Sequence, residues 1–176
     1  GGKWTSFRAF SEEVTDLALG TLKLQRRKST RDLAIGGGHN YPENQETRQA
    51  WIESTSFKTG LSSNRISTLF GRYGTRAETI AEYISQGADA PLKFLPDYSQ
   101  REIEFITLNE KVTHLDDLLL RRSMLAKLGQ LSLANTYEIA NIMGKCLNWS
   151  ADQQDHEIKR TCKILKEFHN VELKQE

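Results

Sequence analysis

The first residues of the chain are the clearest candidates for chemistry. Gly1, Gly2, Lys3, Trp4 and Thr5 lead directly into a segment with helical apolar spacing. Glycines let a backbone approach a ligand closely, and a helix N-terminus offers unpaired N–H groups with partial positive charge. With the added charge of Lys3, such a loop suits an electron-rich group on a cofactor. On the residues alone, a disordered terminus or a cloning remnant stays open as the alternative.

Sequence patterns for other chemistries are incomplete. His156-Glu157 begins like a zinc-protease helix, but the residue four after His156 is Arg160, so we expect no metal site. The run Gly36–Gly38 fits neither GxGxxG nor GxxxxGK[ST], and no serine or cysteine lies in a GxSxG elbow. The basic run at 26–31 could contact phosphate or lipid head groups, although a solvated loop is the commoner interpretation of such a run.

Composition is that of an ordinary soluble domain. The 176 residues are 38% hydrophobic and 27% charged, and the net charge of +1 gives no electrostatic reason to expect nucleic acid as a partner. Cys146 and Cys162 are not in a CxxC arrangement, which favours reduced thiols. No apolar run approaches the ~20 residues that span a bilayer, and the first residues lack the apolar region of a signal peptide. The chain also begins without Met, so we expect a fragment or a processed chain.

The stretch Val112–Gly129 is expected to form a core helix that anchors the fold. Its buried face would consist of Leu115, Leu118 and Leu119. Asp117 precedes Arg121 by four residues, the order that supports a helix. We predict a structural role for the Arg121–Arg122 pair, with Asp116 or Asp117 nearby.

Apolar spacing and capping residues predict further helices around this one. A first helix would run from Thr5 or Ser6 to about Leu24, and its apolar face would comprise Phe7, Phe10, Val14, Leu17, Ala18 and Thr21. A basic linker at 23–32 and a glycine-rich turn at 34–41 would follow. The later helices are expected near 47–58, 63–73, 75–86, 99–110, 134–147 and 151–169, the third of them starting with a capping box between Thr75 and Glu78. These elements predict an all-α bundle of about seven to eight helices.

Four blocks, in this order and spacing, resemble the C-terminal part of FAD-dependent glycerol-3-phosphate dehydrogenases, the aerobic, quinone-linked family. They are GGKWTSFR at 1–8, FGRYGTRA at 70–77, THLDDLLLRRSMLA at 113–126 and LNWS at 147–150 before a final helix. The resemblance covers nearly the whole chain. It implies that residues 1–32 are the terminal loop and helix of the FAD domain plus a linker, and that residues 33–176 are a helical C-terminal cap domain.

The resemblance also implies roles for residues near the flavin. The cofactor-binding residues would be Gly1, Gly2, Lys3, Trp4 and Thr5. Lys3 would also be catalytic, since a lysine and a helix N-terminus both stabilise negative charge on a reduced flavin or a substrate. Arg8 would face the substrate phosphate, with solvent as the alternative. The helical cap would be a structural and docking module.

In the implied parent enzyme, glycerol 3-phosphate is oxidised to dihydroxyacetone phosphate by hydride transfer to FAD, and the electrons pass to quinone. The dinucleotide-binding glycines and most of the substrate domain are absent from these residues, so we expect the fragment to be inactive and not to hold FAD alone. Its expected partner is the rest of the parent flavoenzyme in the cytoplasm, with a homodimer and peripheral contact with the inner face of the membrane left open. The alternatives are a stand-alone helical protein-interaction module and the cap of a related polyol-phosphate dehydrogenase.

Overall fold

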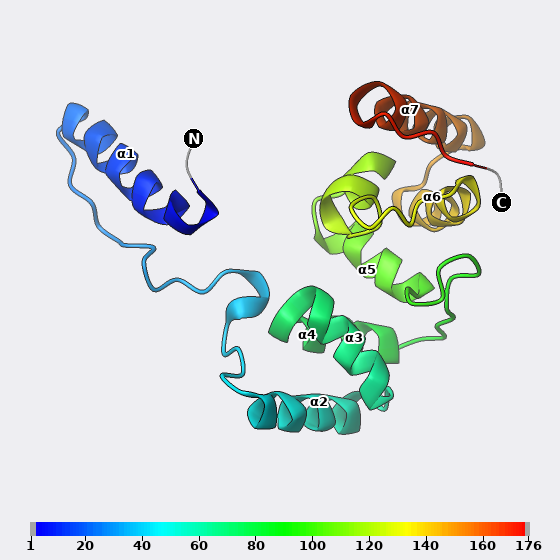
Figure 1. Ribbon diagram of the computed structural model, residues 1–176, viewed down its shortest axis with the longest axis horizontal. Helices are drawn as coiled ribbons and strands as arrows, with labels where there is room; N and C mark the ends of the chain where they lie inside the picture. The colour runs from blue at the N-terminus through cyan, green and yellow to red at the C-terminus, as the bar shows by residue number, and fades with distance from the viewer. Residues whose placement is uncertain (1–2, 175–176) are drawn as a thin grey trace.

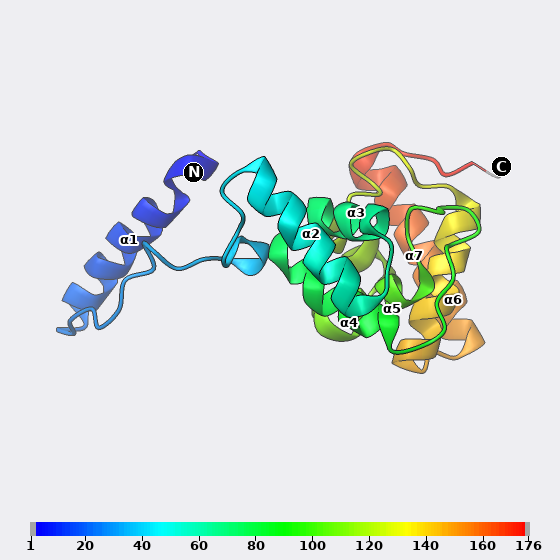
Figure 2. The ribbon, with the colours of Figure 1, turned by 90° about the horizontal axis from the view of Figure 1, so that it is seen from below.

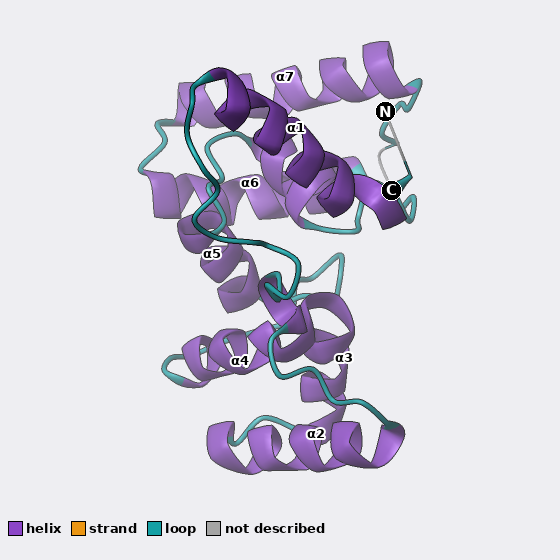
Figure 3. Ribbon diagram, turned by 90° about the vertical axis from the view of Figure 1, so that its left-hand side faces the viewer, coloured by secondary structure: helices purple, strands orange, loops and turns teal. Residues whose placement is uncertain are grey.

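The computed structural model describes residues 3–174, apart from the side chain of Trp4. Over that range the chain forms seven α-helices and no β-strand (Figure 3). The helices are α1 (Phe7–Thr21), α2 (Gln45–Thr59), α3 (Ser63–Tyr73), α4 (Ala77–Ser85), α5 (Gln100–Asn109), α6 (Leu133–Leu147) and α7 (Ala151–His169). The all-α fold predicted from the sequence is therefore confirmed.

Six of the helices pack into one body, whereas α1 stands apart at the end of a long linker (Figures 1 and 2). Helices α2, α3 and α4 form one end of the body, and α5, α6 and α7 form the other (Figure 1). Each end has its own cluster of buried apolar side chains. Tyr73, the last residue of α3, packs against both clusters.

Regular helical spacing builds the cluster of α2, α3 and α4. Ile66, Leu69 and Phe70 lie at i, i+3 and i+4 of α3 and are at most 2% exposed. The stripe predicted for α4 is buried as well, and comprises Ala77, Ile80, Ala81 and Ile84. Full burial of one large apolar side chain stabilises a fold by roughly 1.5–3 kcal/mol. The pattern in the sequence thus accounts for this half of the core.

Caps in the sequence fix the ends of α6 and α7. The hydroxyl of Ser132 accepts from the backbone N–H of Asn135 at the start of α6. Ser150 caps α7 in the same way, as predicted, by accepting from the N–H of Gln153. Both helices end at an asparagine with a left-handed backbone conformation. Between these ends, the two helices contribute Ile139, Met143 and Ile158 to the second cluster.

The prediction of one helix over Val112–Gly129 is wrong. The helical part covers only residues 115–122. Its last six residues, Asp117–Arg122, are of π type and are called the π segment, and Ser123 after it is extended. Two carboxylates shape its start: Asp117 accepts from the N–H of His114 at 3.0 Å, and Glu157 of α7 accepts from the N–H of Leu115 at 3.0 Å. These bonds use N–H groups that a regular helix start would leave unpaired. The predicted leucine face is nevertheless fully buried, at Leu115, Leu118 and Leu119.

The capping box predicted between Thr75 and Glu78 does not form. Gly74–Arg76 is a 3-10 turn, and α4 begins directly after it without a side-chain cap. The hydroxyl of Thr75 lies 3.0 Å from the carbonyl oxygen of Gly37 and 2.7 Å from that of His39. Thr75 therefore fastens the glycine-rich turn of the linker to the start of α4 instead of capping the helix.

The predicted first helix forms as α1, but its apolar face is not buried. Phe10, Val14 and Leu17 are 59%, 47% and 69% exposed. No residue of α1 is buried in the described part of the chain. The amphipathic pattern thus predicts the helix correctly, and the rest of the described chain leaves its apolar face exposed.

Candidate functional site

The predicted cofactor loop is described from Lys3 onwards, since Gly1 and Gly2 lie outside the described residues. Lys3 is exposed and precedes the 3-10 turn Trp4–Ser6, which runs into α1. The backbone N–H and the hydroxyl of Ser6 donate to the carbonyl of Lys3, at 3.0 and 3.1 Å. Thr5 is exposed as well. The loop thus brings Lys3 and Thr5 together at one end of α1.

The N-terminus of α1 carries positive potential that no described side chain offsets locally. Its N-cap residue, Ser6, makes no side-chain cap hydrogen bond, and its first turn contains no acidic residue. The first N–H groups of a helix have no partner within the helix, so they stay available to an acceptor. With Lys3 exposed beside them, they form a donor set suited to an electron-rich group.

Arg8, the predicted substrate residue, already has partners within the chain. Its Nη1 donates to the carbonyl oxygens of Thr30 and Arg31, at 2.7 and 3.1 Å. These bonds tie the first turn of α1 to the end of the basic linker. Arg8 therefore lies close in sequence to Lys3, but its guanidinium is turned at least in part towards the linker.

The linker is folded back along α1 by a second arginine. Arg26 donates to the carboxylates of Glu12 and Asp16, at 2.5 and 2.8 Å, and to the carbonyl oxygen of Glu12. Ser29 donates to Glu12 at 2.7 Å, and this bond with the charge of Arg26 lowers the pKa of Glu12. One residue of the basic run is therefore bound to acids of α1, while Arg27 and Lys28 remain exposed.

A buried carboxylate, that of Glu102, joins α3 to α5. Glu102 is fully buried and accepts from Arg65 at 2.6 Å, from Arg72 at 3.0 Å and from the hydroxyl of Tyr73 at 2.7 Å. The guanidinium of Arg72 also lies 3.6 Å from the centre of the Tyr98 ring. Burial, followed by the charge of Glu102, raises the pKa of Tyr73. These groups satisfy one another, so the cluster is suited to holding two helices together.

Sequence analysis missed the Glu102 cluster. Arg65 and Arg72 are 37 and 30 residues away from their acid, and no local pattern connects such distant groups. The only signal was the presence of two arginines seven residues apart on α3, which places them on the same side of a helix.

A second buried carboxylate, that of Asp116, holds the π segment to α7. Asp116 is 2% exposed and accepts from Arg121 at 2.7 Å and from Arg160 of α7. Burial by itself would raise the pKa of Asp116, but the hydrogen bonds from the two arginines outweigh it and lower the pKa. Arg121 also reaches Asp117 at 2.9 Å. The predicted proximity of Arg121 to these two acids is confirmed.

Two further features of the described residues concern metal-binding clusters and membrane-spanning helices. Among residues 3–174, no group of three or more histidine, cysteine, aspartate or glutamate side chains could hold a metal ion. None of the helices in this range is both long and apolar enough to cross a membrane.

The family of the C-terminal domain of alpha-glycerophosphate oxidase matches residues 28–154. A probable glycerol-3-phosphate dehydrogenase of Encephalitozoon cuniculi is 27% identical over 96% of this chain and 27% of its own length. The mitochondrial glycerol-3-phosphate dehydrogenase of Saccharomyces cerevisiae is 26% identical over 96% of this chain and 29% of its own length. A glycerol-3-phosphate dehydrogenase of Mycobacterium leprae is 25% identical over 90% of this chain and 27% of its own length.

The chain spans between a quarter and a third of the length of these relatives. No solved structure gives a significant match to it.

Proposed function

This chain belongs to the family of the C-terminal domain of alpha-glycerophosphate oxidase, and we propose that it is the helical cap of a larger FAD-dependent glycerol-3-phosphate dehydrogenase. In that parent enzyme, glycerol 3-phosphate would lose a hydride to FAD and a proton to a base, which gives dihydroxyacetone phosphate. The electrons would then pass to quinone. The chain by itself would be inactive.

The observation that carries this proposal is the uncovered apolar face of α1. A face with Phe10, Val14 and Leu17 exposed is energetically unfavourable in water and is typical of a surface that packs against another part of the protein. The family match begins at residue 28, after α1 has ended. Both facts support the assignment of residues 1–32 to the FAD domain and its linker, and of residues 33–176 to the cap.

The N-terminal edge of α1 is proposed as the flavin side of the active site. The donor set fits the group: exposed Lys3, the N-terminal N–H groups of α1 and the absence of an acid in its first turn all favour negative charge nearby. When bound, FAD supplies the two-electron acceptor. Lys3 would hold charge on the flavin or the substrate, Thr5 would contact the cofactor, and Gly1, Gly2 and Trp4 would join them as the resemblance implies.

We propose that Arg8 binds the substrate phosphate with only part of its guanidinium group. Its Nη1 is engaged by the carbonyl oxygens of Thr30 and Arg31, so it would bind phosphate through its remaining N–H groups. Residues 33–176 would serve as a docking module, and the parent enzyme would lie in the cytoplasm. Whether the parent forms a homodimer, and whether its basic linker contacts a membrane surface, are left open by this proposal.

The parent enzyme offers the direct test. We would express it with Lys3→Ala, with residues 33–176 deleted, and with Lys28→Ala as a matched control on an exposed lysine. Flavin content would be measured by absorbance, and flavin reduction by glycerol 3-phosphate would be followed without oxygen. Lys3→Ala should slow reduction by roughly tenfold or more, because a donor aimed at developing charge is worth at least that much. If Lys3→Ala and Lys28→Ala behave alike, the role of Lys3 is wrong.

The exposed face of α1 also favours a second function, a stand-alone helical interaction module. This alternative predicts that the chain associates through α1 without any flavin domain, which light scattering would detect as a concentration-dependent mass. Leu17→Asp should abolish that association. If the chain stays monomeric at every concentration, the interaction module is excluded and the cap of a flavoenzyme is supported. Kinetics of the parent enzyme with other polyol phosphates would then identify its substrate.

A further inference from the structure

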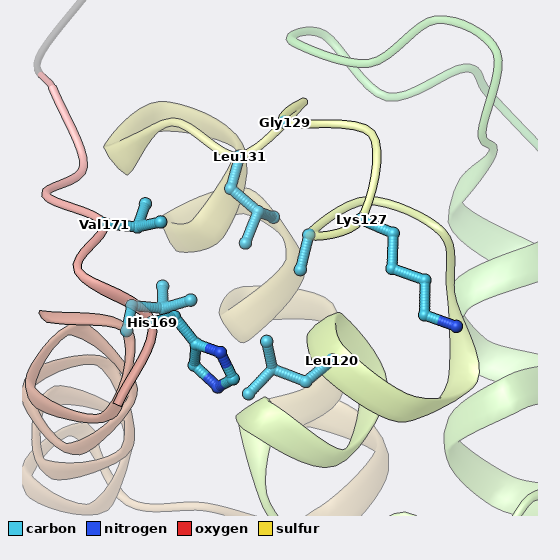
Figure 4. Close-up of a pocket in the computed structure, with 8 residues that line it drawn as sticks. Leu120, Lys127, Gly129, Leu131, His169 and Val171 are labelled. Atoms are coloured by element: carbon cyan, nitrogen blue, oxygen red, sulfur yellow. The ribbon is translucent and has the colours of Figure 1, made fainter. Parts of the chain in front are cut away.

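An apolar pocket of about 290 Å³ opens beside the π segment (Figure 4). It lies between Leu120 of the π segment, the loop that follows this segment, and the C-terminal end of α7. Its walls are mainly hydrocarbon and include Leu120, Ala126, Leu131, Leu165 and Val171. An apolar wall of this kind favours a hydrocarbon group over water.

A second pocket, of about 180 Å³, adjoins the first and has a different character. The two share Leu120 and Lys127 in their walls. The second pocket is otherwise lined by three arginines, Arg72, Arg121 and Arg122, and by neutral residues, with no acidic side chain in its wall. The side chain of Lys127 extends away from His169 and Val171 at the apolar pocket (Figure 4). An apolar pocket and a cationic pocket therefore lie next to each other.

Each of the three arginines is held in place by at least one group outside the cationic pocket. Arg72 is bound by Glu102 and rests on the ring of Tyr98. Arg121 is bound by Asp116 and Asp117. Arg122 donates to the carbonyl oxygen of Glu110 at 2.8 Å. Guanidinium groups that are fixed beforehand lose less conformational entropy when they bind an anion.

The charges around the cationic pocket are not balanced. Arg121 has acidic partners, whereas the bond of Arg122 goes to a neutral carbonyl. Lys127 makes no hydrogen bond or ion pair within residues 3–174. Two cations are thus uncompensated, which matches the charge of about −1.5 to −2 on a phosphate monoester near neutral pH.

We propose that the two pockets form one site for an amphiphile with a phosphate monoester head and a single hydrocarbon chain. The head would bind Arg122 and Lys127, and the chain would lie along Leu120 into the apolar pocket. Each pocket alone is small, but together they reach the range of about 300–1,000 Å³ that is usual for ligand sites. A π segment at the junction agrees with the frequent occurrence of such segments at functional sites. The site is separate from the flavin reaction proposed above.

Isothermal titration calorimetry of the chain with octyl phosphate, octanol and inorganic phosphate tests the proposal. Octyl phosphate should bind one molecule per chain, and at least about tenfold more tightly than either of the others, because only it engages both pockets. Lys127→Gln should weaken octyl phosphate by about tenfold, while Lys28→Gln, on the exposed linker, should not. Val171→Asp should weaken it as well, whereas Val14→Asp, at a similarly exposed valine of α1, should not.

Vesicles of phosphatidylcholine with lysophosphatidic acid, which has a phosphate monoester head and one acyl chain, distinguish the two sources of such a head group. Sedimentation with the vesicles that is lost in Lys127→Gln would identify a membrane phospholipid, and binding of octyl phosphate without sedimentation would identify a soluble ester. Equal affinity for octyl phosphate and inorganic phosphate would overturn the proposal and leave an anion site only. So would octyl phosphate binding that Lys127→Gln and Val171→Asp leave unchanged.

Discussion

Gly37 of the glycine-rich turn and Gly74, directly after α3, lie so close together that neither has room for a side chain. A Cβ added to Gly74 would lie 2.3 Å from the carbonyl oxygen of Gly37, and one added to Gly37 would lie 1.8 Å from the carbonyl oxygen of Tyr73. Gly74 also has a φ of +59°, which favours glycine. With the hydrogen bond of the Thr75 hydroxyl to the Gly37 carbonyl, this contact attaches the glycine-rich turn to the six-helix body.

Gly74→Ala is therefore expected to destabilise the chain. The backbone conformation alone should cost about 1–3 kcal/mol, and the contact with Gly37 adds to that cost. Chemical denaturation followed by circular dichroism measures the change. Gly71→Ala is the control, because Gly71 lies within α3 with nothing within 4 Å of an added Cβ, and alanine there should stabilise by about 0.5–1 kcal/mol. Equal effects of the two substitutions would contradict this account.

Glu102→Gln should reduce stability more than any exposed charge substitution. It leaves Arg65 and Arg72 without their shared acid, and the loss of one partner from a buried pair costs about 3–5 kcal/mol. We expect the lower end, because the two arginine side chains are 20% and 18% exposed. Glu104→Gln, on the same helix and 3.7 Å from Arg101, should cost less than about 1 kcal/mol. Urea denaturation of both variants measures the two changes in unfolding free energy. Similar losses of stability would show that the buried Glu102 cluster stabilises the fold no more than an exposed ion pair does.

The carboxylate of Asp116 predicts an acid-dependent loss of stability. Its pKa in the folded chain lies below the ordinary value of 3.8, so the unfolded chain binds a proton first as the pH falls. The stability that its arginine partners confer is complete well above pH 3.8 and is lost as the pH falls through the lowered pKa. Asp116→Asn should flatten the dependence of the unfolding free energy on pH in this acidic range, and Arg160→Gln should flatten it in part. Slopes identical to that of the unchanged chain would refute the assignment.

Substitutions on the apolar face of α1 should separate stability from docking. Leu17→Ser should change the unfolding free energy of the chain by no more than about 0.5 kcal/mol, since Leu17 is 69% exposed. Leu118→Ala, at a fully buried position of the π segment, should cost about 2–5 kcal/mol. In the parent enzyme, however, Leu17→Ser should lower flavin content, which absorbance measures. A Leu17→Ser chain that melts as early as Leu118→Ala would mean that α1 is packed in solution.

Sequence patterns correctly predicted the structural features whose interacting residues lie close together in the chain. Ile66, Leu69 and Phe70 lie on a 3.6-residue period, and the Ser150 cap lies three residues from the N–H that it accepts from. Both signals are complete within one or two turns of helix. The same local rule failed at Thr75, because a hydroxyl that can cap a helix can equally bind a carbonyl brought from 38 residues away.

At the candidate site, too, local sequence patterns do not predict contacts between residues that are far apart in the chain. The pattern of α1 predicted the helix correctly, but Phe10 and Leu17 are exposed, and periodicity alone does not show what an apolar face packs against. The π segment has apolar spacing that a regular helix would also satisfy. One of the bonds that shape its start, from Leu115 to Glu157, comes from 42 residues later and leaves no mark on that spacing. Arg122 and Lys127 meet Arg72 in one pocket for the same long-range reason.

Tyr73 gives the six-helix body a property that neither of its two apolar clusters has alone. Its ring packs against both apolar clusters, and its hydroxyl donates to the buried carboxylate that joins α3 to α5. Unfolding of either half would expose the Tyr73 ring and remove one hydrogen-bond donor from Glu102. Because both costs arise whichever half unfolds, unfolding of one half alone is unfavourable. The six-helix body is therefore expected to unfold cooperatively, in one all-or-none transition.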